Sequence, residues 1–225
     1  MGSIFDGTLS PIVDLPDSAV MRPRTRGLLR RLAMLYPCIV VSGRARGDVL
    51  GKLSGIRVAR VIGNHGAETE TTRNSQCLVD RWLAALELEL GLVPGLWIEN
   101  KGYSVAIHYR HSAEKAEARR KILAAARKLE GVHVFRGKQV VNLAPRSAPN
   151  KGDALAAERD RLGCAWVLYV GDDENDEDAF ALSGCVVSVR VGRKLRSHAR
   201  YYLRSQNEID DLLEALVRLR EPVLA

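Results

Sequence analysis

A short apolar run is followed by an acidic one in the segment Trp166-Val167-Leu168-Tyr169-Val170-Gly171-Asp172-Asp173. The apolar run covers residues 166–170, and the acidic run begins at Asp172. An apolar run that ends at glycine and polar residues is typical of a buried strand and the turn after it. Two further runs of this kind occupy residues 38–41 and 185–189. Apolar residues recur at helical spacing over residues 25–35, 151–162 and 207–220. This alternation predicts an α/β fold, in which helices cover both faces of a parallel sheet.

The middle of the chain has a different pattern. It reads as helix, strand, helix, strand, strand, over residues 78–90, 103–109, 112–129, 132–135 and 140–143. This order predicts an α+β insert with an antiparallel sheet. We therefore expect a discontinuous core of residues 1–68 and 147–225, and a second domain of residues 69–146.

Composition narrows the class of protein. The chain has 225 residues, of which 46% are hydrophobic and 27% charged, as is usual for globular domains. No apolar run approaches the roughly 18–20 residues of a membrane helix, and the first residues do not resemble a secretory signal. The four cysteines are widely spread, which argues against a disulfide scaffold or a zinc finger. We expect a cytoplasmic, monomeric protein without a membrane partner.

The net charge of +7 is compatible with an anionic partner. Arginines concentrate at residues 22–31 and 190–204, beside apolar residues at helical spacing. We interpret both clusters as solvated faces of surface helices. Aromatic residues make up only 5% of the chain and are not interleaved with the basic ones, so a nucleic-acid partner is poorly supported. A small anionic substrate fits the charge better.

The acidic run is the strongest chemical signal. Six carboxylates lie within residues 172–178, directly after a predicted buried strand. Because like charges repel, a cation should lie among them, and Mg²⁺ prefers carboxylate, water and phosphate oxygens. An alternative is an acidic loop that opens a helix, where carboxylates suit the helix dipole. That alternative does not explain Gly171-Asp172-Asp173 directly after the strand.

Three weaker signals accompany it. Asp6-Gly7-Thr8 places a carboxylate in a tight turn, and Ser42 places a hydroxyl at a strand end. Lys151 opens a predicted helix, where a cation is unfavourable unless it has an anionic partner. Each signal alone has an ordinary explanation, as a turn, a helix cap or a solvated lysine.

Together and in this order, the four segments resemble the four motifs of the haloacid dehalogenase (HAD) superfamily of phosphatases. Residues 171–180 resemble the GDDxTDEDAF segment of its trehalose-6-phosphate phosphatases. Further segments resemble the same family, namely Gly63–Glu68, Glu99–Lys101, Ser104–Arg110 and Gly137–Val141. The resemblance covers nearly the whole chain. It implies a Rossmann-like HAD core with an inserted cap domain of the C2 type.

The resemblance also implies a mechanism. An aspartate attacks the phosphorus of a sugar phosphate, here trehalose 6-phosphate, and water hydrolyses the aspartyl-phosphate. Asp6 matches a second aspartate, which protonates the leaving oxygen and later deprotonates the water. Ser42 matches the hydroxyl that binds the phosphoryl group, and Lys151 matches the lysine that neutralises its charge. Mg²⁺ is the implied cofactor, with ligands or supporting groups among Asp6, Asp172, Asp173 and Asp176.

Seven other residues are candidate contacts to phosphate or sugar, namely Arg44, Asn64, His65, Lys101, His108, Arg110 and Asn142. His108 could instead face solvent on its strand, and Lys101 and Arg110 could be surface charges. We expect Trp97 and Tyr103 in the core of the cap rather than as sugar platforms.

Two positions depart from the family pattern. The family's first motif reads DxDGT, and aligning it on Asp6-Gly7-Thr8 places Ile4 at the attacking aspartate. Three interpretations remain open: the sequence lacks residues or a modified aspartate that the working protein has; a deletion makes Asp6 itself the nucleophile; or the chain binds sugar phosphate without turnover. Asn142 replaces a glutamate that contacts sugar hydroxyls, so another substrate, such as sucrose 6-phosphate or mannosyl-phosphoglycerate, is an alternative.

Overall fold

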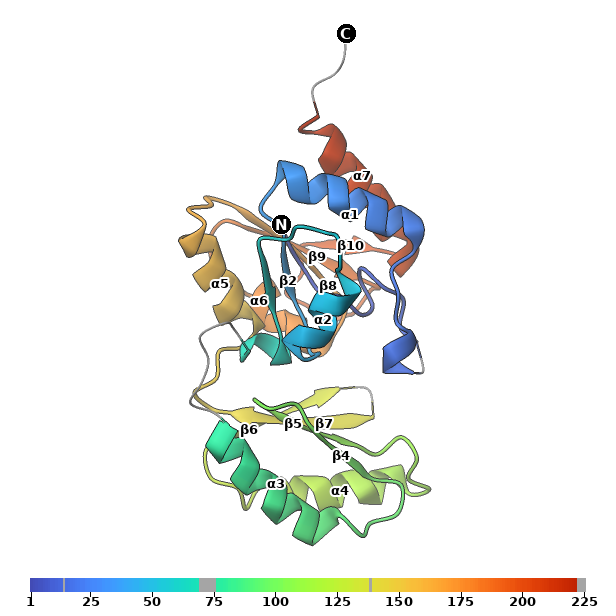
Figure 1. Cartoon of the computed structure of the whole chain (residues 1–225), viewed down its shortest axis with the longest axis vertical. Coiled ribbons are helices and arrows are strands. Elements are labelled where there is room, and N and C mark those ends of the chain that lie inside the picture. Colours follow the sequence, from blue (N-terminus) through green and yellow to red (C-terminus); the bar gives the residue numbers. More distant parts are fainter. Residues whose placement is uncertain (14, 69–75, 138, 222–225) are drawn as a thin grey trace. The chain divides into compact units, whose positions relative to one another are not determined.

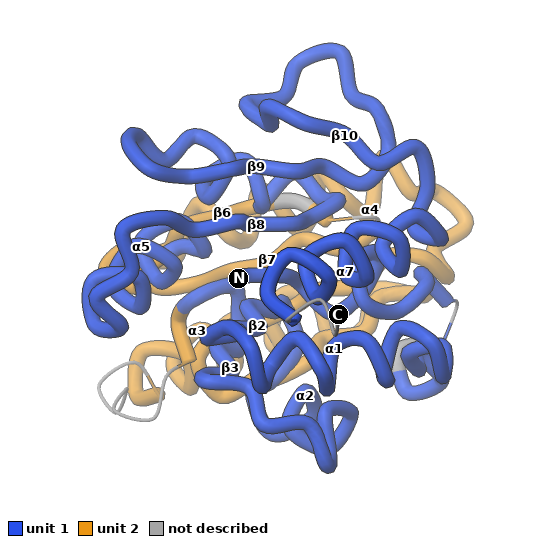
Figure 2. Tube along the Cα trace, turned by 90° about the horizontal axis from the view of Figure 1, so that it is seen from above, with its two compact units in different colours: residues 1–66, 150–225 blue, residues 67–149 orange. Residues whose placement is uncertain are grey.

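The computed structural model describes residues 1–13, 15–68, 76–137 and 139–221. The chain divides into two compact units, shown in different colours in Figure 2. The first unit contains Met1–Gly66 and Asn150–Ala225, and the second contains Ala67–Pro149. The structure thus divides the chain two or three residues away from the predicted boundaries. Residues 69–75, where the insert was predicted to begin, lie outside the described residues, as does Lys138.

The first unit is built on a six-stranded sheet (Figure 1), in the order β10-β9-β8-β1-β2-β3. All of its strand pairs are parallel. The strands are β1 Gly2–Ser3, β2 Ile39–Val41, β3 Arg60–Ile62, β8 Val167–Gly171, β9 Val186–Val191 and β10 Tyr201–Leu203. The predicted parallel sheet is therefore confirmed, with three strands that the sequence pattern did not indicate or barely indicated: β1, β3 and β10.

Helices cover both faces of this sheet. They are α1 Pro23–Leu35, α2 Arg46–Lys52, α5 Lys151–Arg161, α6 Glu177–Phe180 and α7 Ile209–Arg218. Successive residues of a strand point to opposite faces, so Val40 packs with α1, α2 and α7, whereas Ile39 and Val41 pack with α5. Of the arginines in residues 190–204, Arg190 lies on β9, three lie in the loop between β9 and β10, and Arg204 directly follows β10. The interpretation of that cluster as a helix face was therefore wrong.

Short 3₁₀ turns complete the first unit, namely η1 Pro16–Ser18, η2 Asn64–Gly66, η3 Glu174–Asp176 and η4 Gln206–Glu208. Two of them, η2 and η3, begin shortly after the carboxyl ends of β3 and β8, with one and two residues between. These ends lie at one edge of the sheet because the strands are parallel.

The second unit contains a four-stranded antiparallel sheet in the order β4-β5-β7-β6. Its elements are α3 Gln76–Leu90, β4 Trp97–Asn100, β5 Val105–His108, α4 Lys115–Ala126, β6 Val132–Gly137 and β7 Val140–Pro145. Apolar side chains of α3 and α4 pack on one face of the sheet, around Trp82, Ile107 and Ile122. The predicted antiparallel insert is confirmed, and β4 is an additional strand.

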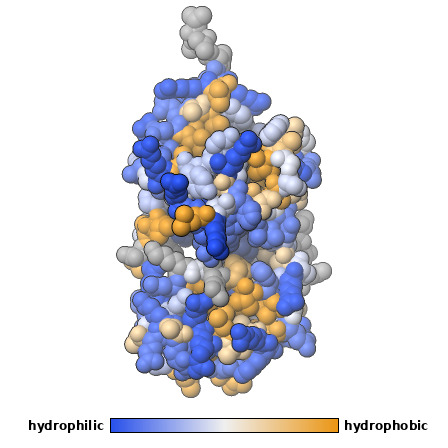
Figure 3. Space-filling view, turned by 180° about the vertical axis from the view of Figure 1, so that it is seen from behind, coloured by the Kyte–Doolittle hydropathy of each residue, from blue (hydrophilic) through white to orange (hydrophobic). Residues whose placement is uncertain are grey.

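The face of the molecule in Figure 3 is mostly hydrophilic, with hydrophobic patches on each unit. Exposed large apolar residues include Met34, Leu88, Leu92, Trp166, Leu195 and Leu219. Scattered residues of this kind are normal on globular proteins. Among the described residues, no helix is both long enough and apolar enough to cross a membrane.

Candidate active site

The predicted site residues of the first unit come from three neighbouring strands. Asp172 directly follows β8, Asp6 follows β1, and Ser42 directly follows β2. Since these strands are adjacent and parallel, their loops meet at one edge of the sheet. Lys151 is the first residue of α5, which Asn150 caps through a reciprocal pair of hydrogen bonds with Asp153.

Lys151 and Asp176 form a buried ion pair. The Lys151 ammonium lies 2.7 Å from Asp176 Oδ1, and the two side chains are 3% and 0% exposed. Asp176 also accepts hydrogen bonds from the Tyr169 hydroxyl and from the backbone N–H groups of Asp172 and Asp173. Burial of a charge is tolerated only when its hydrogen-bonding capacity is used in this way. Asp176, one of the predicted metal ligands, is thus occupied in shaping the loop, which leaves it little capacity to bind a cation.

Asp172 has one carboxylate oxygen, the buried Oδ1, that accepts no hydrogen bond. A Cβ added at Gly7 would lie 2.1 Å from Asp172 Oδ2, and Gly7 has a φ of +72°, so this close approach requires glycine. Burial raises the pKa of Asp172 to about 7, and the charges of Asp176 and Asp173 add to the rise.

Of the predicted metal ligands, only Asp172 has a buried carboxylate oxygen without a hydrogen-bond partner in the described part of the chain. Within the ranges that the structure describes, no three His, Cys, Asp or Glu side chains gather in a metal-binding arrangement. The Asp173 side chain accepts a hydrogen bond from the Glu174 N–H, and Asp6 is held by Arg44. Asp172 remains as a buried carboxylate with an orphaned oxygen. This fits Mg²⁺, which one or two carboxylates commonly bind together with water and phosphate oxygens.

Arg44 is bound to Asp6 through two hydrogen bonds of 2.6 and 2.7 Å. A third nitrogen donates to Asp48 at 2.7 Å. Burial lowers the pKa of Arg44, but the hydrogen bonds and charges of both carboxylates outweigh it and raise the pKa above its ordinary value. The predicted substrate contact Arg44 therefore neutralises and orients Asp6.

Ser42 and the turn of η2 lie beside this pair. The Ser42 hydroxyl is buried and accepts a hydrogen bond from the Arg44 N–H at 3.2 Å. Asn64 and His65 both have left-handed backbone, with φ of 48° and 59°. The imidazole of His65 lies against Gly43, where an added Cβ would be 2.4 Å from Cε1. The structure thus brings Ser42, Asn64 and His65 to the same edge of the sheet.

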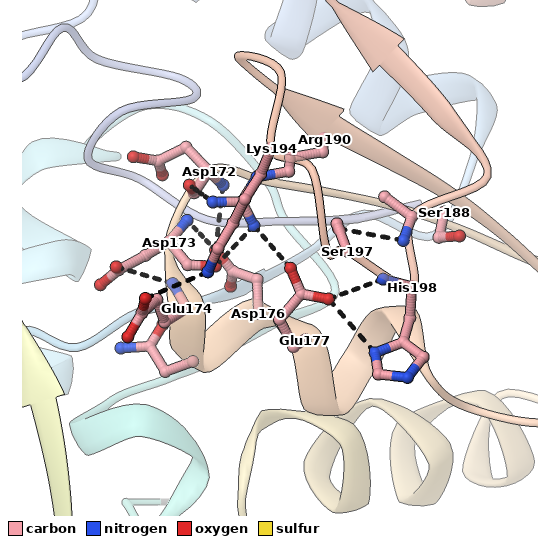
Figure 4. Close-up of polar contacts among 12 residues, drawn as sticks. Asp172, Asp173, Glu174, Asp176, Glu177, Ser188, Arg190, Lys194, Ser197 and His198 are labelled. Carbon is pink, nitrogen blue, oxygen red and sulfur yellow. Dashed lines mark hydrogen bonds and ion pairs between the residues drawn. The ribbon is translucent and has the colours of Figure 1, made fainter.

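Arg190 belongs to the site although the sequence did not single it out. Its guanidinium is almost fully buried and donates to the backbone oxygens of Asp172 and Asp173 at 2.5 and 3.0 Å (Figure 4). It also forms an ion pair with Glu177 at 2.8 Å. The sequence held one sign of this role: Arg190 directly follows the apolar run of residues 185–189. A charged residue at the end of a buried strand lies at the edge of the sheet where the loops meet.

The second unit holds the remaining candidates on the sheet face opposite its helices. His108 Nε2 lies 2.9 Å from Glu99 Oε2, and Lys101 lies 3.8 Å from the same oxygen. Strand register places Asn142 in one row with Glu99 across the sheet. Trp97 stacks on His108 with ring centroids 4.7 Å apart and is 57% exposed, so its predicted place in the core was wrong. Arg110 lies two residues beyond β5, outside this row.

A model of the trehalose-phosphatase family matches residues 4–184. The chain belongs to the trehalose-phosphatase family. The trehalose-phosphate phosphatase of Mycobacterium tuberculosis is 36% identical over 198 residues, which cover 80% of this chain and 50% of that protein. The probable trehalose-phosphate phosphatase 9 of Oryza sativa is 28% identical over 255 residues, covering 95% of this chain and 68% of that protein. The chain therefore spans about half the length of the mycobacterial relatives.

Solved structures share the fold of this family member. The crystal structure of a trehalose-6-phosphate phosphatase related protein has a TM-score of 0.79 at 24% identity, covering 97% of this chain and 96% of that one. The C-terminal domain of the Candida albicans trehalose-6-phosphate phosphatase has a TM-score of 0.79 at 19% identity, with coverage of 98% and 92%. A phosphatase of the HAD superfamily from Bacteroides thetaiotaomicron has a TM-score of 0.69 at 16% identity, with coverage of 96% and 94%. The predicted HAD fold is confirmed.

Ile4 remains the clearest departure from the trehalose-phosphatase pattern. Its side chain is 5% exposed and packs in an apolar cluster with Leu155, Tyr169 and Phe180. Because Gly2 also faces Leu155 and Tyr169, positions 2 and 4 point to the face that α5 covers. A side chain at position 4 therefore lies on the side from which Lys151 enters the site.

Proposed function

We propose that this chain binds a sugar phosphate and Mg²⁺ at the edge formed by β8, β1 and β2, and that this site is built for phosphomonoester hydrolysis. The observation that carries the proposal is that one edge of the sheet holds a buried ammonium, a buried hydroxyl and a buried carboxylate oxygen without a hydrogen-bond partner, from Lys151, Ser42 and Asp172. A phosphate needs cationic and hydroxyl donors, and its metal needs a carboxylate. Membership of the trehalose-phosphatase family supports trehalose 6-phosphate as the substrate.

Each residue then has a defined part. The Ser42 hydroxyl and the Lys151 ammonium bind phosphoryl oxygens and offset their charge. Asp172 would hold Mg²⁺, which supplies Lewis-acid stabilisation of the phosphoryl oxygens when bound. Asp6, held by Arg44, would give a proton to the leaving sugar oxygen and take one from the attacking water.

Position 4 decides whether hydrolysis follows binding. With aspartate there, a carboxylate oxygen attacks phosphorus, the sugar oxygen leaves with the proton from Asp6, and water then releases phosphate from the aspartyl-phosphate. With Ile4 no such bond can form. The chain as written should bind sugar phosphate but release phosphate very slowly, since loss of a covalent nucleophile costs roughly three orders of magnitude or more.

A pair of variants tests the proposal. Ile4→Asp and its matched control Ile4→Asn are assayed for phosphate release from trehalose 6-phosphate, sucrose 6-phosphate and mannosyl-phosphoglycerate, with and without Mg²⁺. We expect Mg²⁺-dependent release by the aspartate variant alone, and calorimetric binding without turnover by the unchanged chain. Absence of activity in a folded Ile4→Asp protein on every substrate, together with absence of binding, would overturn the proposal. Robust turnover by the unchanged chain would overturn the part assigned to position 4.

The second unit offers the groups that would select the sugar. Glu99, Lys101, His108 and Asn142 present carboxylate, ammonium, imidazole and amide groups, which together can donate to and accept from sugar hydroxyls. Trp97 adds an exposed aromatic face beside His108. We expect Asn142→Glu in the Ile4→Asp background to shift the substrate preference towards trehalose 6-phosphate. An unchanged preference would argue against a selecting part for Asn142.

A further inference from the structure

Asn175 connects Lys151 at the start of α5 with His65 in the η2 turn. The family segment GDDxTDEDAF has threonine at this position, whereas this chain has asparagine. Asn175 Oδ1 accepts a hydrogen bond from the Lys151 ammonium at 2.6 Å. Its Nδ2 lies 3.1 Å from His65 Nδ1. A threonine hydroxyl is a single atom on a shorter side chain, and it cannot occupy both places.

The hydrogen-bonding capacity of each group fixes the direction of this chain of contacts. A lysine ammonium can only donate, so the oxygen of the Asn175 amide must face Lys151. The amide nitrogen, which can only donate, must then face His65. His65 Nδ1 can therefore only accept, which requires a neutral imidazole whose proton is on Nε2.

The surroundings of His65 hold the ring in place for this contact. The left-handed backbone of Asn64 is common for asparagine, but that of His65 is sterically unfavourable and persists only when neighbouring structure imposes it. The Asn64 N–H donates to the Arg44 carbonyl at 2.9 Å, and the His65 N–H donates to the Ser42 carbonyl at 2.8 Å. The ring itself lies between Gly43 and Asn175. Two backbone hydrogen bonds and the absence of a Cβ at Gly43 thus aim Nδ1 at the amide.

We infer that His65 and Asn175 are positioning residues for Lys151: the neutral, Nε2-protonated imidazole fixes the Asn175 amide, and the amide oxygen fixes the ammonium against Asp176. Asn175 is thus a replacement that ties the η2 turn to the lysine. The consequence for turnover rests on the proposed function, but the protonation pattern of His65 does not.

Nuclear magnetic resonance of the ring nitrogens of the unchanged chain tests the pattern directly. The chain has only five histidines, so assignment by single substitution is practical. At pH 8, above the ordinary histidine pKa of about 6.5, we expect an unprotonated Nδ1 and a protonated Nε2 for His65. A protonated Nδ1 in the unchanged protein would overturn the inference at once.

Two substitutions at position 175 sharpen the test. Asn175→Asp keeps the shape but puts a carboxylate oxygen, which can only accept, against His65, so the proton should move to Nδ1. Asn175→Thr should remove the donor to Nδ1, and the preference for the Nε2-protonated form should then weaken. Retention of the original pattern in both variants would refute the link. If the aspartate variant does not fold, the threonine variant and the unchanged chain still decide the question.

Turnover in the Ile4→Asp background provides the functional readout. His65→Ala removes the acceptor, and we expect kcat to fall on the order of tenfold, because small misplacements of catalytic groups are costly. His65→Asn places an amide oxygen near the position of Nδ1 and suits left-handed backbone, so it should restore most of kcat. Equal loss in both variants, with unchanged folding, would contradict positioning through the acceptor. If Ile4→Asp itself is inactive, the proposed function fails while the resonance experiment still decides the hydrogen-bond pattern.

Discussion

Replacement of Asp172 by asparagine should stabilise the metal-free protein, and the gain should grow with pH. The pKa of Asp172 is about 7 in the folded chain, against an ordinary value of 3.8. The folded state therefore binds the proton more tightly, and the stability of the unchanged protein falls as pH rises between these two values. The two pKa values differ by about 3, and each pKa unit corresponds to about 1.4 kcal/mol, so ionised Asp172 costs at most about 4 kcal/mol above pH 7.

Urea unfolding in the presence of a chelator measures this effect. Integration over the same window predicts a gain for Asp172→Asn of about 2 kcal/mol at pH 5 and about 4 kcal/mol at pH 8, as upper limits. Asp160→Asn is the matched control because that side chain is 67% exposed, and it should change stability by less than about 0.5 kcal/mol at both pH values. A gain for Asp172→Asn that does not depend on pH, or a loss at pH 8, would refute the account of this carboxylate.

Two further substitutions test other contacts of the loop. Asp176→Asn leaves the Lys151 ammonium buried without its counter-charge, and we expect urea unfolding to show a loss of about 3–5 kcal/mol. A loss below about 1 kcal/mol would mean that the ion pair is not buried as described. Gly7→Ala introduces a Cβ at φ +72° and 2.1 Å from Asp172, so the melting temperature and any Mg²⁺ binding should both fall. Unchanged Mg²⁺ binding by that variant in calorimetry would contradict the close approach.

The sequence was sufficient for the parts of the fold that have a periodic pattern. The runs that became β2, β8 and β9 and the helical spacing of α1, α5 and α7 predicted the parallel sheet. Strands of two or three residues show no alternation, and only an uninterrupted apolar run, as in residues 38–41, reveals them; β3 begins at an arginine and β10 lies between two arginines, so both were missed. Their pairing is set by neighbouring strands rather than by their own residues.

The sequence predicted where the site lies in the fold, but not which side chains within it bind one another. Strand ends located Ser42 and Asp172, since residues that follow adjacent parallel strands must meet. Partner choice depends on side-chain geometry that spacing does not encode. The predictions of Asp176 as a metal ligand or supporting group and of Arg44 as a substrate contact gave no sign of their ion pairs with Lys151 and Asp6. Arg190 was hidden in a basic stretch that the structure places on and beyond β9.

The Ile4→Asp variant tests Mg²⁺ binding as well as catalysis, because it adds a negative charge that a bound cation would offset. Position 4 is 5% exposed in an apolar cluster, so an aspartate there should cost about 3 kcal/mol or more in the absence of metal. It also adds a negative charge to a site in which Asp172 is already incompletely compensated. A bound divalent cation would relieve both penalties, and its binding free energy adds to the stability of the folded state. We therefore expect Mg²⁺ to raise the melting temperature of Ile4→Asp by more than that of the unchanged chain, with no rise when Asp172→Asn is added. An equal Mg²⁺ effect in all three proteins would show that the ion binds elsewhere, and that Asp172 and position 4 do not share it.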